Sequence, residues 1–164
     1  MYRQVDRDAQ LTQGDIIDEC PLLIWEEAHA GGKPHAAEFV GRIVVLTQAC
    51  DLAQAKITRV VTALVHDAKK LVSAGILKPR TIQDQVRSHR VYGWYFLPAG
   101  NHLDESIVDL RDVHTISRSI LEELIRQGNR LCQIESPYRE HLAQHFAITY
   151  SRIGLPLPYE TKVE

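Results

Sequence analysis

Short runs of apolar and β-branched residues recur along the first two thirds of the chain, and each run predicts a β-strand. Residues 41–48 (GRIVVLTQ) are apolar at consecutive positions, which predicts a central strand covered on both faces. Residues 57–66 form a second β-branched run, and residues 91–98 (VYGWYFLP) form an aromatic one. Residues 11–27 open with a Gly-Asp turn and are interrupted by charged residues and a proline, which predicts a strand pair or a bulged strand.

The pattern becomes helical towards the end of the chain. Two further short strands are predicted at residues 106–110 and 113–116. Ser117 can then cap a helix that ends near Gly128, and the Ser-Pro pair at 136–137 opens a longer helix that reaches residue 154. Strands first and helices last favour an α+β fold.

Two segments break this order. Residues 68–90 contain helix-forming residues on both sides of Gly75 and Pro79, which predicts two short helices inserted between strands. Residues 28–38 (AHAGGKPHAAE) are small, polar and rich in glycine, which predicts an exposed, mobile loop.

Composition limits the class of protein. A chain of 164 residues with 45% hydrophobic and 24% charged residues is typical of one globular domain, here residues 1–164. No apolar run approaches the roughly 18 residues that span a bilayer, so we expect a soluble protein with no export signal and no membrane partner. Three widely spaced cysteines predict neither disulfides nor a zinc site and favour a cytoplasmic location. The formal net charge of −2 means that any nucleic-acid contact needs a local basic patch.

One basic segment offers such a patch. Within and after the predicted insertion, basic side chains are followed by aromatic ones, a mixture that can pair phosphate attraction with base stacking. The alternative is a solvated helical face beside an aromatic core strand. The candidate substrate-binding residues are Lys78, Arg80, Arg87, Arg90 and Trp94.

Three other groups of residues carry candidate chemistry. Cys50, beside Asp51, is a nucleophile if a histidine lies near it in space, although a neighbouring carboxylate raises a thiol pKa and a buried structural cysteine is the simpler interpretation. His35 lies in the glycine-rich segment and is a second candidate for acid–base work. His141 and His145 have the spacing of two helical metal ligands, but no third ligand is evident, so we predict no metal and no other cofactor.

Four stretches taken together resemble the MazF/PemK family of toxin ribonucleases. They are residues 14–17 (GDII), 42–48, 60–68 and 106–121. The resemblance implies an SH3-like barrel with a helical insertion at 68–90 and C-terminal helices, and it implies a homodimer. The family residues that act on the scissile phosphate fall on Arg42 and on His66, where imidazole replaces the family's threonine or serine.

Two functions follow from this resemblance. The first is a nucleic-acid-acting protein, in its strongest form a metal-independent endoribonuclease toxin that binds RNA, with Arg42 and His66 as catalytic residues. The alternative is a non-catalytic adaptor of a bacterial defence or toxin–antitoxin system that binds a protein partner such as an antitoxin. The family's Glu-Gln loop signature is absent and the net charge is slightly acidic, and both facts favour the adaptor. In that case Arg42 packs at a strand end and the His66-Asp67 pair caps a turn.

Overall fold

The computed structural model of this protein describes residues 1–26, 33–54, 56–100 and 102–151. A seven-stranded sheet in the order β1-β7-β2-β3-β4-β6-β5 forms the body, and every neighbouring pair is antiparallel. The α+β class is thereby confirmed. The strands are β1 (Tyr2–Arg3), β2 (Asp15–Glu26), β3 (His35–Val45), β4 (Arg59–Asp67), β5 (Trp94–Leu97), β6 (Ser106–Ser117) and β7 (Arg130–Ile134).

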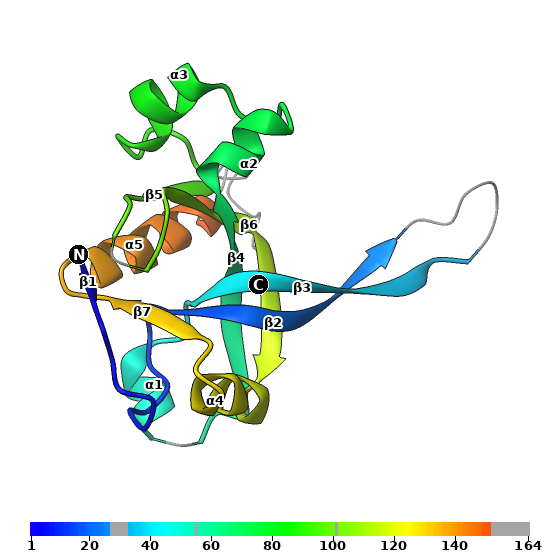
Figure 1. The fold of residues 1–164 in the computed structure, drawn as a ribbon, viewed down its shortest axis with the longest axis vertical. Helices are drawn as coiled ribbons and strands as arrows, with labels where there is room; N and C mark the ends of the chain where they lie inside the picture. Colours follow the sequence, from blue (N-terminus) through cyan, green and yellow to red (C-terminus); the bar gives the residue numbers. More distant parts are fainter. Residues whose placement is uncertain (27–32, 55, 101, 152–164) are drawn as a thin grey trace, which may run out of the picture.

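Helices cover the sheet from several sides (Figure 1). In this view α2 and α3 lie above the sheet, α1 and α4 lie below it, and α5 lies just under β5. The helices are α1 (Ala49–Ala53), α2 (Ala68–Ser73), α3 (Pro79–Thr81), the π-helical turn η2 (Ile82–Val86), α4 (Arg118–Arg126) and α5 (Tyr138–Tyr150).

Strand β3 separates two hydrophobic cores. Because side chains alternate along a strand, Ile43 and Val45 face a core that includes Leu121 of α4, whereas Val44 faces a second core that includes Leu142 of α5. All three β3 side chains are fully buried. The prediction of a central, doubly covered strand is confirmed for residues 43–45, whereas the strand ends at Val45 and not at residue 48.

The predicted insertion builds a third core on the outer face of β5. Trp94 and Phe96 pack with residues of α2 and η2, whereas Tyr95 and Leu97 point into the core beneath α5. The prediction of short helices within residues 68–90 is confirmed, since α2, α3 and η2 all fall there. The positive φ of Gly75 (72°) and the proline at the start of α3 account for the break between them.

Several predicted boundaries are wrong. Residues 35–38 belong to β3 and not to a loop, because they pair with residues 23–26 of β2; residues 28–32 lie outside the described residues. Residues 106–117 form one strand, β6, with a register shift opposite Ala63 and Leu64, rather than two strands. Strands β1 and β7 were not predicted at all, and β7 follows α4, so the chain does not simply end in helices.

Strands β2 and β3 extend beyond the rest of the sheet as a hairpin, which we call the arm (residues 18–26 and 35–42). β2 pairs with β7 only at residues 15–17, and β3 pairs with β4 only at residues 43–45. Beyond these positions the two strands pair only with each other, among the described residues. Figure 1 shows the arm projecting from the body.

Candidate functional site

A β-bulge places a carboxylate against the guanidinium of Arg42. In β2 the register shifts between Ile17 and Cys20, so Asp18 and Glu19 together lie opposite Arg42. Glu19 takes a left-handed conformation (φ 55°), which lets the strand resume its pairing. Arg42 Nη2 donates to Asp18 Oδ2 at 2.7 Å, and both side chains are about one quarter exposed, at 26% and 30%. The predicted cation is therefore already paired.

The end of β4 brings His66 to the same region. Asp67 follows it and caps α2, its carboxylate accepting hydrogen bonds from the backbone N–H groups of Lys69 (2.7 Å) and Lys70 (3.2 Å). The cap predicted for the His66-Asp67 pair is thus made by the Asp67 side chain. Because β3 and β4 separate beyond the Ile43–Leu64 pair, a gap opens between Arg42 and His66.

This gap is a cleft of about 710 Å³ between β3, β4, α2 and the segment that precedes β6. Arg42 and His66 both line it, so two residues that are 24 positions apart in the sequence meet in one cavity. The cleft also holds one further cation, one further imidazole and several carboxylates. These additional polar residues are Asp18, Glu19, Asp67, Lys70, His102 and Asp104.

The electrostatics of the cleft are mixed and slightly acidic. Four carboxylates face two permanent cations, Arg42 and Lys70. Two of the carboxylates are engaged, since Asp18 binds Arg42 and Asp67 caps a helix. His66 and His102 are the two imidazoles that line the cleft, and imidazole is the side chain best suited to move protons near neutral pH. The arrangement can polarise an oxyanion and transfer protons.

The predicted basic patch lies outside this cleft. Arg80 is exposed and binds Asp84 at 3.2 Å, and the guanidinium of Arg87 lies 5.4 Å from the ring centre of Phe96. None of the residues Lys78, Arg80, Arg87, Arg90 and Trp94 is among those that line the cleft.

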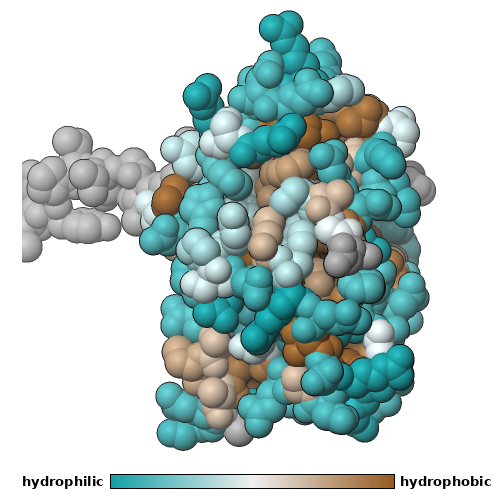
Figure 2. All heavy atoms as spheres, turned by 60° about the vertical axis from the view of Figure 1, so that its left-hand side comes forward, coloured by the Kyte–Doolittle hydropathy of each residue, from teal (hydrophilic) through white to brown (hydrophobic). Residues whose placement is uncertain are grey.

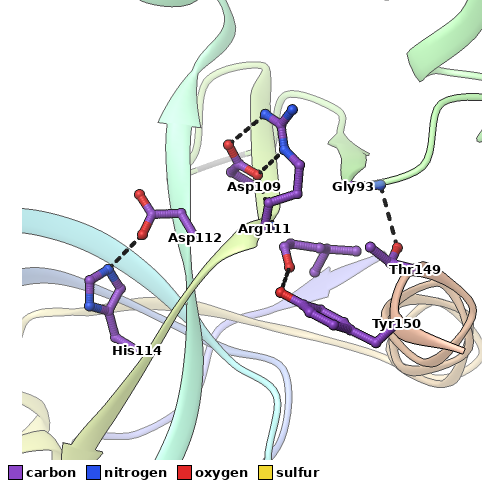
Figure 3. A network of polar contacts seen from close by, with 8 residues as sticks. Gly93, Asp109, Arg111, Asp112, His114, Thr149 and Tyr150 are labelled. Atoms are coloured by element: carbon purple, nitrogen blue, oxygen red, sulfur yellow. Dashed lines mark hydrogen bonds and ion pairs between the residues drawn. The ribbon is translucent and has the colours of Figure 1, made fainter.

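The structure contradicts a stacking role for Trp94. Its side chain is 7% exposed and packs in the core beneath the insertion. Arg111 covers one face, with its guanidinium carbon 4.1 Å from the ring centre, and Asp109 holds that guanidinium by two hydrogen bonds (Figure 3). The aromatic residues at 94–96 are explained by core packing, because every residue of β5 is buried.

The secondary candidates are scattered. Cys50 is exposed on α1 with its sulfur 3.8 Å from an Asp51 carboxylate oxygen, so the expectation of a buried cysteine is wrong. Its other sulfur contact is the Gln48 side chain, and no histidine contacts the thiol among the described residues. His35 lies on the arm, where it pairs with Glu26 at 3.4 Å. Neither Cys50, Asp51 nor His35 lines the cleft.

A separate histidine cluster connects α5 to the insertion. The His89 ring lies 4.5 Å from that of His141 and 5.7 Å from that of His145, measured between ring centres. Tyr95 completes the cluster, with its hydroxyl 3.2 Å from His141 Nδ1. Burial, followed by the neighbouring imidazoles, lowers the pKa of His89, and burial likewise lowers the pKa of His145. Within the described part of the chain no three potential ligands are placed to hold a metal ion.

Sequence reasoning missed His102, Asp104 and the pairing of Asp18 with Arg42. His102 and Asp104 lie in the polar segment before β6, which has no periodicity to mark it. The charged residues that interrupt an apolar stretch indicated the bulge in β2. Nothing in the sequence indicated which strand lies opposite the bulge.

No family model and no curated protein matches this chain. Among the described residues no helix is long and apolar enough to cross a membrane. The surface facing the viewer in Figure 2 is mostly hydrophilic, with apolar side chains in separate patches.

Proposed function

We propose that this chain is a cytoplasmic, MazF/PemK-like protein that cleaves RNA without a metal ion, using the cleft between β3 and β4. One observation supports this best: Arg42 and His66, chosen by a resemblance in sequence, line a single cavity. The strongly bent sheet of the family's SH3-like barrel is part of the same proposal, and so is the homodimer that the resemblance implies.

The cleft contains the groups that such a reaction needs. One imidazole, His66 or His102, removes the proton from a ribose 2′-hydroxyl, and the 2′-oxygen attacks the adjacent phosphorus. Arg42 and Lys70 stabilise the extra negative charge on the phosphoryl oxygens. The other imidazole, entering protonated, gives its proton to the departing 5′-oxygen. The products are a 2′,3′-cyclic phosphate and a 5′-hydroxyl end.

The Asp18–Arg42 pair sets a condition on this reaction. A phosphate that reaches Arg42 must share the guanidinium with Asp18 or displace it, because the pair is made at 2.7 Å. The remaining carboxylates also repel a polyanion. Binding therefore depends on local contacts, and we expect it to weaken steeply as salt concentration rises.

The test is cleavage of a labelled mixed-sequence RNA in excess EDTA by the wild type and by three single variants, Arg42→Ala, His66→Asn and His102→Asn. His35→Asn, on the arm, is the matched control. We expect loss of cleavage of at least about a hundredfold in each cleft variant, by the usual size of acid–base and charge contributions, and none in the control. A bell-shaped pH dependence and a 2′,3′-cyclic end complete the expectation. Intact RNA with the wild type would reject the proposal.

A specific observation favours a second function. The arm exposes large apolar side chains, and the cleft lining is net acidic, two features that suit a protein partner better than a nucleic acid. The adaptor alternative therefore gains weight if the wild type leaves RNA intact.

A further inference from the structure

The arm has one covered face and one bare face. Leu22 and Phe39, which pair across the hairpin, point towards the core beneath α4, and the Phe39 ring lies 6.2 Å from that of His114 in β6. The next pair, Leu23 and Glu38, points the opposite way because side chains alternate along a strand.

The bare face is apolar. Three pairs of residues share it: Pro21 with Val40, Leu23 with Glu38, and Trp25 with Ala36. Trp25 is 76% exposed, and Leu23 and Val40 are each 61% exposed. An isolated two-stranded hairpin is marginal in water, and large exposed apolar side chains on it mark a contact surface.

This face continues into the cleft. Arg42 lies two residues from Val40 on the same side of β3, and both residues line the cavity. From Ala36 to Arg42 the strand covers roughly 20 Å at 3.3 Å per residue. On the edge of β3 that faces the cleft, residues 35–42 pair with no strand among the described residues. Their backbone groups on that edge can therefore pair with an added strand.

The charge around this face indicates which kind of molecule binds there. Four carboxylates lie on the arm, namely Asp18, Glu19, Glu26 and Glu38, and Arg42 is the one lysine or arginine within the arm. Arg42 is already paired with Asp18, whereas Glu19 and Glu38 make no ion pair among the described residues. A polyanion is repelled by such a surface and a basic segment is attracted to it.

We propose that the arm binds an extended segment of a partner protein that presents both apolar side chains and a Lys or Arg on one face, in the pattern apolar–x–basic–x–apolar. The segment pairs with the free edge of β3, packs its apolar side chains on Trp25, Leu23 and Val40, and places its basic side chains near Glu38 and Glu19. Its end enters the cleft between Arg42 and His66. This binding does not depend on whether the cleft cleaves RNA.

Two features make the test direct. Trp25 is 76% exposed and Trp94 is 7% exposed, so Trp94→Phe leaves a single reporter at the proposed surface. Displayed random peptides are selected on the wild-type chain and depleted on a Leu23→Ser, Trp25→Ser variant. Enriched peptides are then synthesised and titrated against the Trp94→Phe chain while the Trp25 emission is followed.

We expect the enriched peptides to carry an apolar–x–basic–x–apolar pattern and to shift the Trp25 emission to shorter wavelength. Trp25→Ser, whose binding is followed with labelled peptides because the reporter is gone, should weaken binding at least about tenfold, as for a central interface aromatic residue. Glu38→Lys should weaken binding without removing apolar area. Ile148→Ser, at a 48% exposed apolar position on α5 that does not line the cleft, is the control and should change nothing.

Four results would overturn the proposal. The first is enrichment of acidic peptides, and the second is that no peptide remains after depletion on the double variant. The third is a Trp25 emission shift that follows protein concentration together with a doubled mass, and the fourth is an equal shift of the Trp25 emission by RNA. The third result would assign the arm to a second copy of this chain, and the fourth to a nucleic acid. Circular dichroism of Glu38→Lys separates loss of binding from loss of fold.

Discussion

Asp18 and Arg42 face each other across the bulge of β2, and their 2.7 Å contact joins the base of the arm to the cleft. The bulge places two residues opposite one, so the carboxylate reaches the guanidinium from the neighbouring strand. The backbone N–H of Asp18 donates to the carbonyl of Asn129 at 2.8 Å, which fixes the bulge to the segment before β7.

Asp18→Asn should free Arg42 at little cost in stability. Because the pair is about one quarter exposed, we expect its removal to lower the free energy of unfolding by no more than about 1 kcal/mol, while RNA binding strengthens several-fold. Urea denaturation and fluorescence polarisation with labelled RNA measure the two effects. Asp84→Asn, which breaks the exposed Arg80 pair, is the control. A loss above about 2 kcal/mol would mean that the pair chiefly holds the bulge.

Gly14→Ala should destabilise the protein more than Gly75→Ala does. Both glycines have positive φ, 85° and 72°, so alanine costs each about 1 kcal/mol of backbone strain. At Gly75 nothing lies within 4 Å of an added Cβ, whereas at Gly14 the carbonyl oxygen of Ile134 lies 3.0 Å away. We expect about 1–2 kcal/mol more for Gly14→Ala, measured by urea denaturation. Equal losses would show that β7 moves aside freely.

The histidine cluster should make stability depend on pH. Burial lowers the pKa of His89 and of His145 below the ordinary 6.5, so both bind fewer protons when folded than when unfolded. The stability that the two neutral imidazoles contribute to the folded state is fully present above pH 6.5. It is lost as the pH falls from 6.5 towards the lower pKa values of the folded state, because the unfolded chain then binds more protons. We expect His89→Gln to reduce this slope between pH 7 and 5, measured by urea denaturation at each pH.

Arg130→Met should be among the most destabilising single changes. Arg130 is 3% exposed at its side chain and binds the fully buried Asp15 at 3.1 Å. Burial raises the Asp15 pKa, and the Arg130 charge opposes that rise, so removing the guanidinium leaves a buried, unpaired carboxylate. We expect a loss of about 3–5 kcal/mol, against less than about 0.5 kcal/mol for the exposed Arg126→Met.

The same variant should loosen the N-terminal segment. Arg130 also donates to the carbonyls of Asp6, Ala9 and Gln10, at 2.6, 2.8 and 3.2 Å. Amide hydrogen exchange in residues 6–10 should therefore accelerate in Arg130→Met. A smaller loss for the Asp15→Asn, Arg130→Met double variant than for Arg130→Met alone would identify the unpaired charge as the cause.

Local pattern determined much of the fold. Consecutive apolar residues at 43–45 marked a doubly buried strand because no polar face remained, and the Gly75 and Pro79 breaks divided the insertion into short helices. β7 escaped notice because its sequence, RLCQI, begins and nearly ends with polar residues whose partners, Asp15 among them, lie far away in the chain.

The sequence alone selected Arg42 and His66 and left open whether they meet. Only the tertiary structure decided that, because β3 and β4 separate after the Ile43–Leu64 pair and this separation creates the cleft. The burial of Trp94, the exposure of Trp25 and the pairing of Asp18 with Arg42 were likewise decided by the third dimension. Alternation tells which residues share a face, but which face is covered depends on elements distant in the chain.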